Sequence, residues 1–100
     1  MSAYVVVTYD ISDPKGYEAY VPGVIPLLQK HGAEILVADY ASEALEGKAP
    51  GVTVVLKFPS EQAARAWYND PAYIPVRQIR FSSAANNLVL LTKQFVMPSA

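Results

Sequence analysis

Apolar residues along this chain are spaced in two ways: some segments have the pattern typical of strands, and others have the pattern typical of helices. Between the first and second strand-like segments, and again between the third and fourth, apolar residues recur every three or four positions, as on an amphipathic helix. The predicted order is therefore strand, helix, strand, strand, helix, strand. The strand-like segments are short runs rich in valine, leucine and tyrosine, and they predict strands over residues 3–10, 33–40, 52–58 and 87–95.

The first helical segment contains two prolines that conflict with a single straight helix. Asp13 is a suitable N-cap residue, and Gly32 is a suitable stop. Pro22 and Pro26 lie between them, and proline lacks the N–H that a helix interior requires. We therefore expect either a kink or a short helix followed by a second helix that begins near Pro22.

The second helical segment is interrupted as well. Ser60 caps a helix predicted over residues 61–69, and Pro71 ends it. One or two further helical turns are expected afterwards, with Pro75 near their start. Residues 41–51 contain glycine and proline among polar residues, and they predict a loop.

This order of elements is the split βαβ arrangement of ferredoxin-like domains. It predicts the α+β class, with a four-stranded antiparallel sheet and both helices on one face. We expect a single domain over residues 1–100, with its core over about residues 3–95.

The face of the sheet opposite the helices is unusually apolar. In the last strand, for example, Leu88 and Leu90 alternate with Val89 and Leu91, so both faces carry large apolar side chains. Exposing such a face costs about 25 cal/mol per Å², and a contiguous apolar patch marks an interface. We expect a homodimer through this open sheet face. In the alternative, a monomer, the face is kept polar by Thr8, Thr53, Lys57, Thr92 and Lys93.

Composition strengthens the dimer hypothesis. The chain has 100 residues, 52% of them hydrophobic, and it has no cysteine and one histidine. A chain of this length buries only about 60 to 65% of its unfolded surface, so its own core is marginal. No disulfide is possible, and one histidine argues against a protein-only zinc site. We expect no metal, and a second subunit is the remaining stabiliser.

Charge and the N-terminal sequence narrow the class of protein. Eight lysines and arginines face nine acidic residues, and the basic residues are scattered rather than gathered into a patch. Nucleic acid binding is therefore not expected. The first ten residues lack the pattern of a signal peptide, and no segment predicts a membrane span. We expect a cytoplasmic protein.

Three stretches of the sequence resemble a bacterial family, domain of unknown function 1330, within the dimeric α+β barrel superfamily. They are DISDPKGYEAYV, EGKAPGVTVVLKFPS and ARAWYNDPAYIPVRQIR, at residues 10–21, 46–60 and 64–80. The resemblance implies a ferredoxin-like dimer and no established reaction. The wider superfamily includes cofactor-independent monooxygenases, lactone isomerases, haem proteins and ligand-sensing domains. The chain departs from the family around its second strand, where Ala38 and Asp39 replace an arginine–glycine pair.

Aromatic residues on the helical segments suggest a small-molecule cleft between sheet and helices. Seven tyrosines in this short chain are a high number, and a tyrosine hydroxyl can donate to a carbonyl or phenolate oxygen. The alternative is that these side chains only pack in the core. The candidate binding residues are Tyr17, Tyr20, Trp67, Tyr68 and Tyr73.

Charged residues supply the remaining candidates. His31 is the side chain expected to titrate near neutrality, although it also suits a helix C-terminus. Asp39 in an apolar cleft would be an acid or base, or otherwise a turn residue at a strand end. Arg77 and Arg80 lie three positions apart, on one face of a helix, and could together clamp a carboxylate. In the alternative, they pair with Asp70, Glu61 or a partner subunit. Lys57 could face the cleft or reach its rim.

Two hypotheses follow. In the first, the cleft binds a small aromatic or carboxylate-bearing metabolite and supports cofactor-independent proton transfer or oxygenation. His31 or Asp39 would then be the base, Tyr20 or Tyr68 would orient the substrate, and Arg77 would hold its anionic group. In the second, the chain is a non-enzymatic ligand-binding or dimerisation module. No flavin, nicotinamide or phosphate-loop pattern occurs, so we expect no cofactor.

Overall fold

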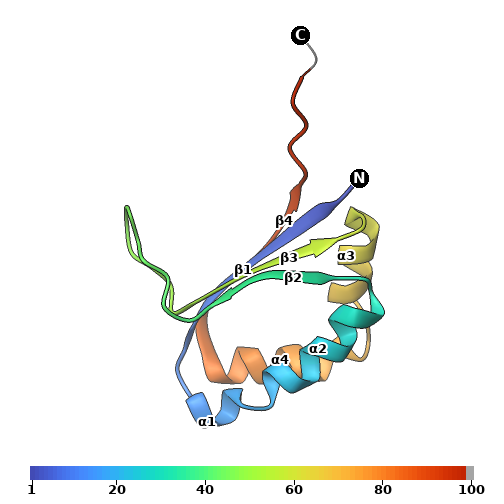
Figure 1. The fold of residues 1–100 in the computed structure, drawn as a ribbon. Helices are drawn as coiled ribbons and strands as arrows, with labels where there is room; N and C mark the ends of the chain where they lie inside the picture. The colour runs from blue at the N-terminus through green and yellow to red at the C-terminus, as the bar shows by residue number, and fades with distance from the viewer. Residues whose placement is uncertain (99–100) are drawn as a thin grey trace.

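A computed structural model describes residues 1–98 of the chain. The strands form one antiparallel sheet in the order β2-β3-β1-β4, and the helices cover one of its faces (Figure 1). The predicted α+β class and order of elements are confirmed. The strands are β1 (Ala3–Ile11), β2 (Glu34–Asp39), β3 (Val52–Phe58) and β4 (Ala84–Lys93). The helices are α1 (Pro14–Tyr17), α2 (Tyr20–Lys30), α3 (Glu61–Tyr68) and α4 (Tyr73–Ser83).

The helical boundaries follow the predicted caps and breaks. The side chain of Asp13 caps α1, and the side chain of Ser60 caps α3 by accepting from the N–H of Ala63 at 3.0 Å. The segment that contains the two prolines forms two helices, the short α1 followed by α2, which is one of the two expected arrangements. Pro26 lies inside α2. The helix after Pro71 is longer than the one or two turns expected, because α4 continues to Ser83.

The last strand differs from its prediction at both ends. It begins at Ala84 rather than residue 87 and ends at Lys93 rather than residue 95. The earlier start depends on a bulge, since the pairing with β1 shifts between Thr8 and Asp10. Asn86 adopts a positive φ of 55° there, a conformation that asparagine tolerates better than most residues. The strand can therefore continue pairing beyond the irregularity.

The core lies between the sheet and the helical layer. Alternate residues of β1 and β3 point into it. Its largest fully buried side chains include Trp67, Arg80, Tyr9, Tyr73 and Phe58. None of the helices within residues 1–98 is long and apolar enough to cross a membrane.

The open face of the sheet is organised in rows that run across the strands. One apolar row joins Val37 to Val55, Val55 to Val6, and Val6 to Leu90. The neighbouring rows are mainly polar, with Glu34, Lys57, Tyr4 and Thr92 in one and Asp39, Thr53, Thr8 and Leu88 in the other. Lys93 does not belong to this face, contrary to expectation, because its partner Ala3 is buried on the helix side.

Two segments extend away from the body of the molecule (Figure 1). The connection between β2 and β3 carries Leu45, which is 90% exposed. The segment after β4 carries Phe95, 76% exposed, followed by Val96 and Met97, which are also exposed. Large apolar side chains are therefore presented to solvent outside the single-chain core.

Candidate functional site

A cavity of about 250 Å³ lies between the sheet and α2. An engineered apolar cavity of about 150 Å³ accommodates benzene, so this volume suits one ring with a substituent. We call it the tyrosine cavity. Its lining is Val7, Tyr9, Tyr17, Tyr20, Val21, Val24, Ile25, Leu28, Ile35, Ala38, Tyr40, Val54, Leu56 and Trp67.

Tyrosine hydroxyls from separate elements meet around this cavity. The hydroxyl of Tyr17 on α1 is hydrogen-bonded to that of Tyr9 on β1, and it lies 3.2 Å from that of Tyr40 after β2. The hydroxyls of Tyr20 on α2 and Tyr73 on α4 lie 2.7 Å apart. One connected set therefore runs from half-exposed Tyr40 to buried Tyr9, and a second pair lies deeper among the helices.

The hydroxyls of Tyr9, Tyr17 and Tyr20 are held in their protonated form. Burial raises the pKa of Tyr17, and its hydrogen bonds to Tyr40 and Tyr9 raise it further. Burial also raises the pKa of Tyr20, with Tyr73 adding to the effect, and burial raises that of Tyr9. Around the cavity they are therefore hydrogen-bond donors and acceptors rather than bases.

Arg80 is fully buried next to this cluster, at 0% exposure. Its guanidinium carbon lies 5.7 Å from the ring centre of Tyr9 and 5.8 Å from that of Tyr20, within cation–π range. Burial lowers the pKa of Arg80, but its interactions with Tyr20 and Tyr73 outweigh this effect, and the pKa is raised overall. The core therefore contains a permanent positive charge directly behind the wall of the tyrosine cavity.

The β4 bulge provides the one hydrogen bond found for this guanidinium among the described residues. Nη1 of Arg80 donates to Oδ1 of Asn87 at 2.7 Å, and Nδ2 of Asn87 donates to the carbonyl of Ala84 at 3.2 Å. Nε and Nη2 of Arg80 are buried without a partner. No carboxylate pairs with Arg80 in the described part of the chain.

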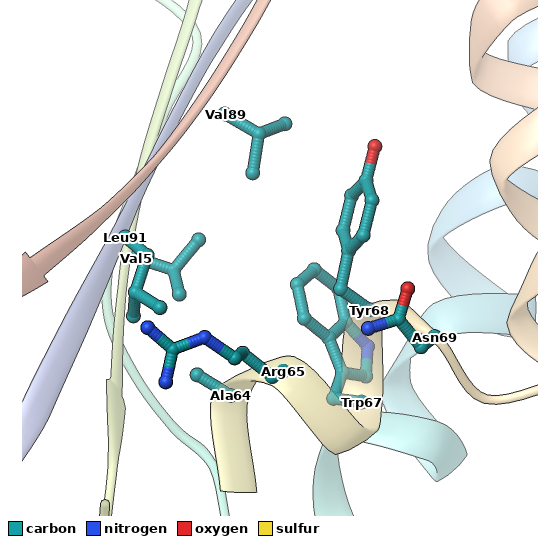
Figure 2. A pocket seen from close by; sticks show the side chains of 8 residues that line it. All are labelled: Val5, Ala64, Arg65, Trp67, Tyr68, Asn69, Val89 and Leu91. Carbon is teal, nitrogen blue, oxygen red and sulfur yellow. The ribbon is translucent and has the colours of Figure 1, made fainter. Parts of the chain in front are cut away.

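A second cavity, of about 260 Å³, lies between α3 and the β1–β4 edge of the sheet. We call it the edge cavity. Figure 2 shows Val5, Val89 and Leu91 on its sheet side and Tyr68 and Asn69 on its helix side. The indole of Trp67 contributes to both cavities, and its Nε1 is buried without a hydrogen-bond partner.

The predicted aromatic residues are divided between these places. Tyr17, Tyr20 and Trp67 line the tyrosine cavity. Tyr73 lies one layer behind it, where its hydroxyl meets that of Tyr20. Tyr68 lines the edge cavity instead.

The predicted charged residues do not converge with them. The guanidinium of Arg77 stacks 4.6 Å above the ring centre of Tyr68, and its Nη1 donates to the Tyr68 carbonyl at 3.2 Å. Arg77 therefore lies in a different environment from buried Arg80, although the residues are one helical turn apart. Lys57 faces away from the cleft, because Leu56 and Phe58 on either side of it point into the core.

Asp39 is exposed on the open face of the sheet, in the same row as Thr53. Its Oδ1 accepts a hydrogen bond from the N–H of Ala41 at 2.8 Å, which is the turn arrangement anticipated for a strand-end aspartate. It does not lie in an apolar cleft, because the bulge between Ile35 and Val37 places Ala38 on the helix side and Asp39 on the other.

His31 lies at the end of α2 and lines neither cavity. Its Nε2 is 2.8 Å from Oδ2 of Asp70, and Nζ of Lys30 is 2.9 Å from the same oxygen. The other carboxylate oxygen of Asp70 accepts from the N–H of Ala72 at 2.9 Å. Asp70 thus joins the end of α2 to the turn between α3 and α4, and the hydrogen bond from His31, followed by those from Ala72 and Lys30, lowers the pKa of Asp70.

Tyr9 and Tyr40 were not among the predicted site residues, and Arg80 was predicted only as one half of a clamp with Arg77. The alternation in residues 3–10 did place Tyr9 on the same face as Val5 and Val7, which is the signal that could have identified it. Tyr40 follows β2, in which the bulge shifts the alternation of side chains, so the sequence pattern did not show which face of the sheet Tyr40 would lie on. Residues 1–98 contain no cluster of three or more side chains suited to a metal ion.

A comparison with known protein families gives a match over nearly the whole chain. Residues 2–94 match the family described as Domain of unknown function (DUF1330), which confirms the resemblance noted in the sequence. No curated protein matches the chain in sequence.

Solved structures show the same fold at low sequence identity. RPA0582, a protein of unknown function from Rhodopseudomonas palustris, has a TM-score of 0.80 at 15% identity, covering 96% of this chain and 84% of its own. A dimeric ferredoxin-like protein of unknown function from Thermobifida fusca has a TM-score of 0.58 at 18% identity, with coverages of 94% and 92%. SnoaB, a cofactor-independent oxygenase from Streptomyces nogalater, has a TM-score of 0.65 at 12% identity, with coverages of 98% and 98%.

Replacing Asp70 with asparagine tests the role of its carboxylate in joining the helices. Because its pKa is lower in the folded chain than in the unfolded one, its ionised form stabilises the fold above the unfolded pKa of about 4. This contribution is lost as pH falls below that value. We expect Asp70→Asn to lower the free energy of unfolding at pH 7, measured by urea denaturation, and the difference from wild type to shrink between about pH 4 and pH 3.

Glu43→Gln is the matched control, since Glu43 is an exposed carboxylate in the loop between β2 and β3. It should leave the free energy of unfolding within about 0.5 kcal/mol of wild type. Equal stabilities of Asp70→Asn and wild type at pH 7 would contradict the assignment.

Proposed function

Because this chain belongs to the DUF1330 family, which has no assigned function, we infer its function from its site. We propose that it is a homodimeric protein that binds a small single-ring metabolite in the tyrosine cavity. The observation that carries this proposal is the combination of an apolar wall with a connected set of tyrosine hydroxyls. Binding pockets commonly have this composition, with few polar groups that fix the orientation of the ligand.

The hydroxyls define what the cavity recognises. Tyr17 contacts both Tyr9 and Tyr40, and each hydroxyl in such a set has one proton to donate. A ligand with a carbonyl or another oxygen acceptor can receive a hydrogen bond where the set meets the cavity. The apolar side chains around it, such as Val24 and Leu56, suit an aromatic or aliphatic ring.

Binding is favoured over catalysis by the chemistry of the lining. None of the residues that line the tyrosine cavity, all within residues 1–98, carries a carboxylate, an imidazole or an amine. His31 is hydrogen-bonded to Asp70 at the end of α2, and Asp39 lies on the other face of the sheet. Proton transfer needs a base within about 3 Å of the proton, so the ligand-binding alternative is the better-supported hypothesis.

The open face of the sheet is proposed as the dimer interface. Its central row, Val37, Val55, Val6 and Leu90, is apolar from edge to edge and flanked by mainly polar rows. An apolar centre with a polar rim is the usual anatomy of an interface. A ferredoxin-like neighbour of this fold is described as dimeric, which supports the same arrangement here.

The segment after β4 is proposed to pack on the partner subunit. Phe95 and Met97 are 76% and 75% exposed, and the segment leaves the body of its own chain (Figure 1). In a dimer formed by facing sheets, this apolar segment reaches a second copy rather than solvent.

Ligand titration tests the tyrosine cavity. We expect the protein to bind a single-ring carbonyl probe, benzamide or benzoate, as followed by NMR titration. Ala38→Phe fills the cavity from β2 and should abolish binding, while Tyr17→Phe removes the central hydroxyl and should weaken binding about 2- to 10-fold. Asn69→Ala, in the edge cavity, is the control and should bind as wild type does. Failure of both probes to bind would overturn the proposal.

Charge placed in the apolar row tests the interface. Leu90→Glu puts a carboxylate into it from each subunit, and a buried, unpaired charge costs several kcal/mol. We expect it to weaken the dimer at least about a hundredfold, seen as a monomer in size exclusion with light scattering. Ile74→Glu, on the half-exposed surface of α4, should remain dimeric. A wild-type monomer at tens of micromolar would rule out the interface.

Polar substitution in the C-terminal segment tests its role. Phe95→Ser with Met97→Ser removes apolar area that the proposal buries against the partner, where each large side chain contributes about 1.5–3 kcal/mol. We expect at least about a tenfold increase in the dimer dissociation constant, measured by sedimentation, with Ile74→Ser unchanged as control. No change in the double variant would place the segment outside the interface.

A further inference from the structure

The positive charge of Arg80 is unusual because its immediate surroundings contain no negative charge. The side chain is 0% exposed, and no acidic residue in the described part of the chain lies within salt-bridge distance of it. A guanidinium cannot shed its proton in a protein, so burial does not neutralise it. A buried charge without a partner is strongly destabilising, and such sites are normally completed by an opposite charge.

The free donors of Arg80 have the geometry of a carboxylate site. Nη1 donates to Asn87 at 2.7 Å, whereas Nε and Nη2 make no hydrogen bond of good geometry, although the hydroxyls of Tyr20 and Tyr73 lie near the guanidinium. Nε and Nη2 lie on one edge of the planar guanidinium, with parallel N–H bonds. This edge forms the fork that accepts a carboxylate with two hydrogen bonds.

The position of this fork connects it with the tyrosine cavity. The guanidinium lies against the rings of Tyr9 and Tyr20, and both residues also line the cavity. Each of these tyrosines also belongs to a hydroxyl pair, Tyr9 with Tyr17 and Tyr20 with Tyr73. The end of the cavity at Tyr9 and Tyr20, which we call its inner end, therefore lies next to hydroxyl groups and a positive charge.

We propose that the ligand of the tyrosine cavity is an organic anion whose carboxylate is bound by Nε and Nη2 of Arg80. This inference rests on the proposed binding function and specifies the class of ligand. The apolar ring occupies the cavity, and the carboxylate points to its inner end. Because Tyr20 stands between the cavity and the guanidinium, binding exchanges the Tyr20–Tyr73 hydrogen bond for hydrogen bonds to the carboxylate.

Arg77 does not provide this site, although it belongs to the same helix. Its guanidinium stacks on Tyr68 and donates to the Tyr68 carbonyl, and it lines neither cavity. Arg77 is therefore the matched control for Arg80, since its replacement removes an equal charge from α4. It approaches the proposed site only at the ring of Tyr73, whose centre lies 5.8 Å from the guanidinium carbon of Arg77.

The test compares two probes that share a ring and differ in charge. Benzoate and benzamide are titrated into the full-length protein, and affinities are measured by calorimetry. We expect wild type to bind benzoate at least about tenfold more tightly than benzamide, as hydrogen bonds to a charged group predict. Arg80→Met keeps the length of the side chain and should remove this preference, whereas Arg77→Met should retain it.

The wild-type protein offers a second readout that does not depend on the stability of a variant. The Nε–H signal of Arg80 in a ¹⁵N NMR spectrum, assigned by its absence from Arg80→Lys or by through-bond connectivity, should shift on adding benzoate and not on adding benzamide. An Arg80 signal that benzoate leaves unchanged would overturn the inference.

The outcomes separate this inference from the proposed function. Equal binding of both probes, or a preference for benzoate that survives in Arg80→Met, would overturn the role of Arg80 and leave the tyrosine cavity as a binding site. Binding of neither probe would overturn both proposals.

Discussion

The burial of one guanidinium is the constraint to which the rest of the core conforms. Arg80 lies on the inner side of α4, where it has to be surrounded by groups that tolerate a positive charge. Tyrosines tolerate a nearby positive charge in two ways, because the face of the ring is negative and the hydroxyl oxygen can accept a hydrogen bond. The rings of Tyr9 and Tyr20 and the bulge that directs Asn87 at Arg80 all serve this one charge. Tyr9 and Tyr20, which surround Arg80, also form part of the wall of the tyrosine cavity.

The two faces of the sheet are suited to different tasks. On the helix side, aromatic and aliphatic side chains surround a cavity. On the open side, the row from Val37 to Leu90 is apolar from edge to edge, as the proposed contact with a second sheet requires. The strands contribute alternate residues to each task, so a one-residue shift in register would disrupt both.

Strand and helix order were predictable from the sequence because they depend on local spacing, caps and proline. The family followed from local residue patterns as well. The site was predictable only in part: Tyr17, Tyr20 and Trp67 line the cavity, but Lys57 and Asp39 lie on the opposite face. The bulge in β2 reversed the direction expected around Asp39, and nothing local to residues 34–39 announces it. Arg80 was seen only as a partner of Arg77, because its burial depends on how α4 packs against residues far away in sequence.

A site with donors and a positive charge but no base has a specific chemical consequence. With the carboxylate ligand that we propose, it stabilises an anion, but its lining holds no group that could create one from a neutral molecule. The histidine that could have done so is tied to Asp70 at the far end of α2, where it supports the packing of the helices. A shared fold with a cofactor-independent oxygenase does not by itself assign that chemistry to this chain. Under the proposed function, Arg80 and the tyrosines select a molecule that is already ionised when it arrives, and the core is organised for recognition rather than for proton transfer.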